Sequence, residues 1–335
     1  RLSGAVRRRV PWWPAQVGVL VATVLAFQLV IALPFAVWSS AVSRYYGLTT
    51  QDWAGWLQDL LLGWSIALLG TALCMLGGVW LARRSPERWW IPAASGAAGL
   101  VFVVSFAYPV LVEPLFNRFS SMPASPLRTQ LLEYAARDGI DVSDVLVADA
   151  SRRTTAYNAY VSGFGSTKRL VLYDNLLAGG RTDQVKVVVA HELGHVRNHD
   201  VLIGTTLGAA AAATGVVGLF LLLRRSWWRR RVGADSAGDP AVVPLVLSLV
   251  VLVGFLALPV QNLVSRHVEA RADLHSLDLT QNPTAFIGLQ QRLAVTNISH
   301  LTPNPILAWW FDDHPTAMDR IAMAVAWADE HAGEP

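Results

Sequence analysis

One short segment of the chain combines two histidines and a glutamate at metal-binding spacing. His191, Glu192 and His195 form an H-E-x-x-H pattern, and a helical pattern that begins near Thr182 runs into it. Residues four apart share one helix face, so both imidazoles can bind a single Zn²⁺. Glu192 then lies beside the metal, where it can take a proton from the attacking water and pass it to the leaving amine. The pattern predicts peptide-bond hydrolysis.

A catalytic zinc needs a third protein ligand and one open position. Glu269 and Asp273 are four apart in another helical segment. We predict that Glu269 binds the metal and that Asp273 accepts the free ring N–H of a ligating histidine. Such a pair beside arginines is by itself more often a salt-bridged surface, so the prediction depends on the upstream motif. His199 and His267 are the alternatives for the third ligand.

The composition indicates that much of the chain lies in lipid. Hydrophobic residues make up 53% of the 335 residues and charged residues only 15%, which disfavours a soluble protein. A hydrocarbon core of about 30 Å is crossed by roughly 20 helical residues. Five apolar stretches are long enough, approximately residues 17–38, 60–82, 91–112, 201–223 and 241–260. They contain no buried pair of ionisable residues, which disfavours a transporter or a non-catalytic zinc sensor.

The net charge of +3 comes from arginine clusters that flank these stretches, around residues 7–9, 83–88 and 224–231. Tryptophans gather at the same boundaries, as expected at headgroup depth. The clusters therefore predict contact with anionic membrane lipid and no nucleic-acid partner. The single Cys74 lies inside the second stretch and cannot form an intrachain disulfide.

The predicted fold class is mostly α, a bundle of transmembrane helices with an inserted α+β zinc peptidase domain. Residues 1–112 form three spans, 113–200 the peptidase domain with its zinc helix, 201–263 two spans and 264–335 a helical part that carries Glu269. Within the insert, a helix is expected over 126–138 and strands over 145–148 and 157–173, the latter turning at Gly163 and Gly165. A last helix is expected to open at 313–315, because proline suits a first turn.

The chain resembles the integral-membrane zinc peptidases typified by CaaX prenyl protease 1, with the heat-shock membrane metalloprotease as a cousin. The matching motifs are Glu113–Phe119, Asn158–Tyr160 with Gly163–Gly165, Arg169–Asp174, the zinc helix, Ser265-Arg266 with Glu269 and Ala272-Asp273, and His314-Pro315 with Arg320. The resemblance implies a gluzincin-type site with zinc at His191, His195 and Glu269, Glu192 as base, and His314 and Arg320 reaching back toward the metal.

Two features depart from that family's pattern. The CaaX branch usually has seven spans, which fits an N-terminal truncation here. The segment 196–200 is closer to the heat-shock cousin, which leaves the prenylated substrate open.

The leading functional prediction is a zinc endopeptidase, with one Zn²⁺ per chain, that cleaves membrane-associated or lipidated polypeptides. The alternative is a quality-control protease of the heat-shock type. Asn158, Ala159, Tyr160 and Gly163 are expected to form an edge strand and turn that bind the substrate backbone. We expect a multi-pass protein of a bacterial plasma membrane.

The positive-inside rule places the arginine clusters in the cytoplasm and the peptidase insert outside. The resemblance implies a cytosolic insert for eukaryotic members, so the sequence leaves the orientation and the oligomeric state open.

Overall fold

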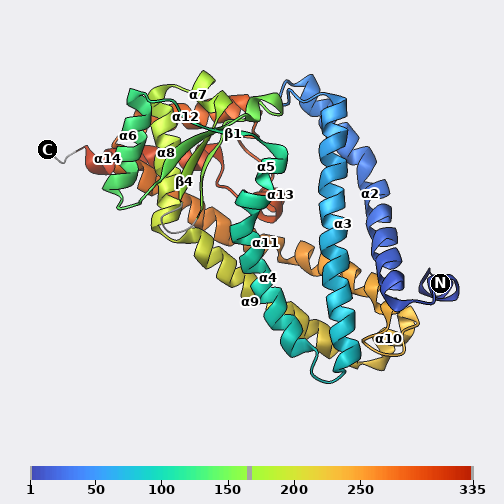
Figure 1. Ribbon diagram of the computed structural model, residues 1–335. Helices are drawn as coiled ribbons and strands as arrows, with labels where there is room; N and C mark the ends of the chain where they lie inside the picture. The colour runs from blue at the N-terminus through green and yellow to red at the C-terminus, as the bar shows by residue number, and fades with distance from the viewer. Residues whose placement is uncertain (1, 164–167, 333–335) are drawn as a thin grey trace. The chain divides into compact units, whose positions relative to one another are not determined.

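The fold was analysed in a computed structural model that describes residues 2–163 and 168–332. Contacts divide the chain into two compact units (Figure 1). Unit 1 comprises residues 1–42, 52–105 and 204–256, and unit 2 comprises residues 43–51, 106–203 and 257–335. Four long helices continue from one unit into the other.

Unit 1 is built from helices, and five of its helical segments are long and apolar enough to cross a membrane, as the sequence predicted. The elements are α1 (Leu2–Arg9), α2 (Trp13–Tyr45), α3 (Trp53–Arg84), α4 (Trp90–Leu111), α9 (Asp200–Arg224), α10 (Ser226–Val232), η3 (Pro240–Val242) and α11 (Val243–Thr280). The helices extend beyond the predicted stretches, because hydropathy marks the hydrocarbon crossing and not the ends of the helix. Many apolar side chains on these helices are exposed, as lipid contact requires.

The three arginine clusters meet at one end of unit 1. Arg83, at the end of α3, donates to the carbonyl of Gly238, and Arg7 of α1 pairs with Asp239. A buried apolar cluster at this end joins Ala82, Trp89 and residues of α9, η3 and α11. The positive-inside rule places all three clusters on one side of the membrane, and their contacts at this end of unit 1 agree with that placement.

Unit 2 contains a four-stranded sheet. Its strands are β1 (Phe119–Ser121), β2 (Asp144–Ala148), β3 (Ala159–Ser162) and β4 (Arg169–Tyr173), in the spatial order β1-β2-β4-β3. Strands β2 and β4 are parallel, whereas β3 is antiparallel to β4 and lies at an edge of the sheet. The predicted strands are present; β1 was missed because three residues are too few to show an alternating pattern. Gly163 follows β3 with a φ of 91°, and Gly165 lies outside the described residues.

The helix that carries the H-E-x-x-H motif is the central element of unit 2. It is α8 (Thr182–Arg197). One of its faces packs on the sheet through Val185, Val189 and Leu193, and the other packs through Val187 against α11, α12 and α14. The remaining helical elements of the unit are α5 (Glu113–Phe116), α6 (Pro126–Arg137), η1 (Ala150–Arg152), α7 (Asp174–Gly179), α12 (Pro283–Thr296), α13 (Pro305–Phe311) and α14 (Ala317–His331).

One predicted helix start is correct and another was wrong by a few residues. Helix α8 begins at Thr182 as predicted, although Arg181 and not Thr182 occupies its N-cap position, and the guanidinium of Arg181 pairs with Asp183. The last helix begins at Ala317, because Thr316 and Asp319 form a capping box there. The segment 313–315 thus precedes the helix, and His314 lies on a connecting segment.

Candidate metal centre

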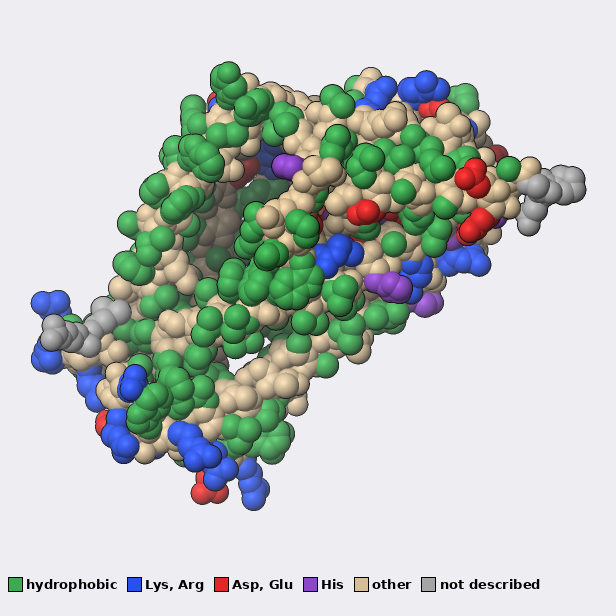
Figure 2. All heavy atoms as spheres, turned by 180° about the vertical axis from the view of Figure 1, so that it is seen from behind, with side chains coloured by type: hydrophobic (Ala, Val, Ile, Leu, Met, Phe, Trp, Pro, Cys, Tyr) green, Lys and Arg blue, Asp and Glu red, His purple; other side chains and the backbone are tan. Residues whose placement is uncertain are grey.

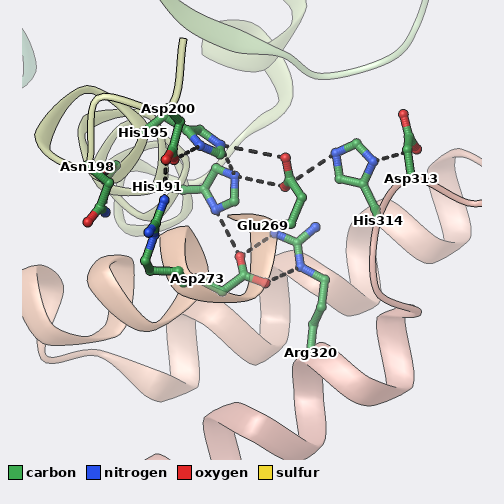
Figure 3. A network of polar contacts seen from close by, with 11 residues as sticks. His191, His195, Asn198, Asp200, Glu269, Asp273, Asp313, His314 and Arg320 are labelled. Atoms are coloured by element: carbon green, nitrogen blue, oxygen red, sulfur yellow. Dashed lines mark hydrogen bonds and ion pairs between the residues drawn. The ribbon is translucent and has the colours of Figure 1, made fainter. Parts of the chain in front are cut away.

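Two helices of unit 2 bring three metal-binding side chains together (Figure 3). His191 and His195 lie one turn apart on α8, and Glu269 faces them from α11. The Nε2 atoms of the histidines are 3.2 Å apart. Glu269 places Oε2 3.3 Å from Nε2 of His191 and Oε1 3.6 Å from Nε2 of His195. Within the described residues, this is the group of three whose donor atoms converge closely enough to share one ion.

A glycine inside the motif explains how the two helices approach so closely. A Cβ at Gly194 would lie 3.1 Å from the side chain of His275 and 3.3 Å from the Cα of Ala272, both on α11. These contacts are tighter than most Cβ atoms make, so the absence of a side chain at Gly194 allows α8 and α11 to approach closely, with Glu269 facing the histidines.

Each histidine of the cluster is oriented by a carboxylate. The Nδ1 atom of His191 is 2.9 Å from Oδ1 of Asp273, and Nδ1 of His195 is 2.9 Å from Oδ2 of Asp200. A carboxylate at Nδ1 holds the ring proton there and leaves the lone pair of Nε2 directed toward the shared centre. The contact of Asp273 agrees with its predicted role, whereas Asp200 was not identified from the sequence.

Each of these carboxylates is in turn held by an arginine. Arg320 donates from Nε to Oδ2 of Asp273 at 2.7 Å and also binds Oδ1 through Nη2. Arg271 donates to Asp200. Asp273 is fully buried, and a fork from Arg320 supplies the compensating charge that such a carboxylate requires.

The electrostatics of the cluster fit a bound cation. Oε2 of Glu269 is buried and accepts no hydrogen bond from a described residue. An unsatisfied buried carboxylate oxygen is costly, and a metal ion would satisfy it. Burial lowers the pKa of His191, but its hydrogen bond with Asp273 and its close contact with the carboxylate of Glu269 outweigh that effect and raise the pKa to about 9. The site therefore holds enough negative charge to attract a cation.

Four of the other predicted residues line a cavity of about 140 Å³ beside this centre. They are Glu192, Asn158, His314 and Arg320. Burial raises the pKa of Glu192, opposed by the nearby His191 and His195, and a raised pKa suits a carboxylate that must accept a proton. Nε2 of His314 lies 3.3 Å from Oε2 of Glu269.

Three further predicted residues lie outside that lining. Ala159 is buried on β3, the hydroxyl of Tyr160 donates to Oε2 of Glu113 at 3.0 Å, and Gly163 forms the turn after β3. Neither alternative ligand belongs to the cluster. His199 is the residue between α8 and α9 with a φ of 56°.

We expect Asp273→Ala to weaken zinc binding by about 10- to 100-fold, because His191 loses the partner that fixes its ring. Zinc affinity of the purified variant is the measurement. Asp278→Ala is the matched control, since Asp278 is on the same helix and accepts a hydrogen bond from Trp327 instead. Equal zinc affinities of Asp273→Ala and the wild type would contradict this role.

Comparison with known proteins agrees with this geometry. The sequence profile of Peptidase family M48 matches residues 122–328, and that of the CAAX prenyl protease N-terminal region, described as five membrane helices, matches residues 13–118. An uncharacterized metalloprotease of Bacillus subtilis, YhfN, is 31% identical over 88% of this chain and 70% of its own length. A CAAX prenyl protease 1 homolog of Arabidopsis thaliana is 26% identical over 90% of this chain and 71% of its own.

The fold also has a solved counterpart. The crystal structure of S. mikatae Ste24p superposes with a TM-score of 0.83 at 19% identity, over 92% of this chain and 76% of that one. The family profile covers more than half of the chain, and its range includes all three residues of the His-His-Glu cluster. The chain belongs to peptidase family M48 and is a multi-pass integral-membrane metalloendopeptidase.

Proposed function

We propose that the chain binds one Zn²⁺ through His191, His195 and Glu269 and hydrolyses peptide bonds of membrane-associated or lipidated polypeptides. The observation that supports this most strongly is the convergence of three donor groups, one of which is a buried carboxylate oxygen that accepts no hydrogen bond from a described residue. Histidine nitrogens and a carboxylate form the ligand set that zinc takes in peptidases, with one position left open. When bound, Zn²⁺ polarises the substrate carbonyl and acidifies water.

The residues of the chain supply the rest of the chemistry. Glu192 accepts the proton of the attacking water and returns it to the leaving amine. Asp273 and Asp200 keep the imidazoles of His191 and His195 in place while charge develops at the centre.

His314 is proposed to stabilise the oxyanion of the transition state. Its ring lies beside Glu269 and remains about half exposed, so a substrate carbonyl can reach it. We expect His314→Ala to retain zinc and to lower kcat by roughly 10²- to 10³-fold, the effect typical of losing one oxyanion donor. Asp313→Ala, which removes the partner of His314 Nδ1, is the control and should cost less. Unchanged kcat in His314→Ala would leave this residue a structural role only.

Arg320 can act either on the transition state, as proposed for His314, or by positioning Asp273, and its contacts suggest a test. Because its guanidinium is forked onto Asp273, Arg320→Ala should weaken zinc binding if it acts by positioning that carboxylate. A loss of kcat at full zinc occupancy would instead support direct action on the oxyanion. Arg320→Lys keeps the charge but cannot make the two-pronged hydrogen bond to Asp273. If Arg320 acts by positioning Asp273, the lysine variant should therefore bind zinc nearly as weakly as Arg320→Ala.

Strand β3 is proposed to bind the substrate backbone. Tyr173 donates its N–H to the carbonyl of Asn158, so these two residues form a hydrogen-bonded pair of the antiparallel ladder. Hydrogen-bonded and non-hydrogen-bonded pairs alternate in such a ladder. The next pair, Ala159 with Leu172, is therefore not hydrogen-bonded, and the N–H of Ala159 points to the open edge. Asn158, directly before the strand, lines the cavity beside the metal ligands. An extended peptide could therefore pair with β3.

We expect Ala159→Pro to raise KM or abolish cleavage, because it removes one open backbone donor without breaking a bond to β4. Zinc content and Tm should stay near wild type. Ala159→Gly, which keeps the donor, is the control. Normal cleavage by a folded, zinc-loaded Ala159→Pro protein would show that the substrate does not add to this strand.

The substrate class is proposed from the relatives that have a named activity, which are CAAX prenyl proteases. They favour lipidated polypeptides over the quality-control alternative. The test compares kcat/KM for a farnesylated peptide and its unlipidated twin of the same sequence. A strong preference for the farnesylated peptide is expected, and equal rates would exclude recognition of the lipid. The similarity to the Bacillus protein supports a bacterial plasma membrane as the location.

A further inference from the structure

Unit 1 contains an apolar groove between helices α3, α4, α9 and α11, with a volume of about 520 Å³. Three glycines, Gly77 and Gly78 of α3 and Gly96 of α4, contribute to its lining. A Cβ built on any of them would meet nothing within 4 Å. These glycines therefore create open space between the helices and do not serve close helix packing. In a chain that crosses a bilayer, such a space must be filled by something apolar.

The groove begins at the arginine-rich end of the unit. Ala82, Trp89 and Leu223 line it at that end, where α3 ends, α4 begins and α9 ends, and Leu73 lies deeper along α3. The nine helical steps from Leu73 to Ala82 rise by about 14 Å. This length is roughly half of a hydrocarbon core about 30 Å thick. The groove thus matches the depth of one lipid leaflet.

Three arginines follow or precede lining residues at the end of the groove that lies at the membrane surface. Arg84, Arg88 and Arg224 are exposed and lie within two residues of Ala82, Trp89 and Leu223 in the sequence. The guanidinium of Arg224 lies 5.6 Å from the ring centroid of Phe220. No carboxylate pairs with any of these three arginines within residues 2–163 and 168–332, whereas Arg7 at the same end is neutralised by Asp235 and Asp239. Figure 2 shows lysine and arginine side chains gathered at this end, beside helices covered with apolar side chains.

We propose that the groove binds one acyl chain of an anionic phospholipid whose phosphate is held by Arg84, Arg88 and Arg224. Burial of an acyl chain in the groove exchanges one apolar environment for another, because the chain leaves lipid and not water, so selectivity must come from the headgroup. An anionic headgroup supplies the charge that the three arginines lack. The bound lipid then joins four helices at the arginine-rich end of the unit.

The test is native mass spectrometry of the full chain in detergent, with phosphatidylglycerol or phosphatidylcholine carrying identical acyl chains. We expect one phosphatidylglycerol molecule to bind roughly 10- to 100-fold more tightly than phosphatidylcholine, as three interfacial arginines imply. The triple variant R84Q/R88Q/R224Q should lose this preference. The single Cys74 lines the groove and is exposed, so the bound lipid should also slow its reaction with a maleimide.

Two controls separate a specific site from lipid that merely surrounds the protein. R8Q/R230Q/R231Q removes three positive charges at the same end, around a different cavity, and should keep the preference. Gly78→Leu should fill the groove and block lipid binding. Gly70→Leu should leave lipid binding unchanged, because Gly70 is on the same helix and equally uncrowded but lies outside the groove. The proposal would be overturned if the wild type bound both lipids equally or if the two triple variants had equal effects. It would also be overturned if phosphatidylglycerol did not change the rate of Cys74 labelling.

Discussion

Glu192→Ala is expected to retain full zinc and to lose peptide hydrolysis, with kcat reduced by at least about 10²- to 10⁴-fold. Glu192 lines the cavity beside the metal ligands but is not one of the three converging donors. Its substitution therefore removes the proton acceptor without removing a ligand. Zinc per chain and kcat, measured on one preparation, give both halves of the result.

Glu192→Gln is the matched variant, since it keeps the shape of the side chain but cannot accept the proton. It should be as inactive as Glu192→Ala. A zinc-loaded Glu192→Ala protein with near wild-type turnover would exclude Glu192 as the base and leave the metal assignment untouched.

Glu269→Ala is expected to lower zinc occupancy further than Asp273→Ala, beyond the roughly 10- to 100-fold loss of affinity typical of an orienting partner. Two imidazoles on one helix remain, and both had Glu269 as their shared neighbour at 3.3 and 3.6 Å. Zinc content after dialysis against a weak chelator is the measurement.

His199→Ala and His267→Ala serve as the comparison, because each removes a histidine that sequence spacing offered as an alternative ligand. Both should retain zinc. Unchanged zinc in Glu269→Ala together with loss in either histidine variant would move the third ligand to that residue.

The parts of the site that follow from local periodicity could be predicted from the sequence. The four-residue spacing of His191 and His195 defines one helix face, and the same spacing relates Glu269 to Asp273. The prediction that the two helices face each other followed from the chemistry of zinc, because a catalytic zinc requires a third protein ligand. The long apolar helices were equally accessible, since about 20 apolar residues are sufficient to indicate a span.

The contacts that depend on a turn of the chain could not be predicted. Asp200 reaches His195 because His199 adopts a positive φ between α8 and α9, a conformation that no spacing rule indicates for histidine. The pairing of Arg271 with Asp200 depends in turn on that reversal. The segment 43–51 belongs to unit 2 and is held there by hydrogen bonds from Thr49 and Thr50 to residues 104 and 101 positions away, and no local pattern encodes such contacts.

The central claim is that a zinc ion held by His191, His195 and Glu269 is required for peptide hydrolysis. The most direct measurement removes metal from the purified chain, restores Zn²⁺ in steps, and follows zinc per chain and cleavage of one peptide in the same samples. We expect no cleavage without metal and a rate that rises in proportion to zinc until one ion is bound per chain. Undiminished cleavage by the metal-free chain, or zinc binding with no cleavage of any tested peptide, would contradict it.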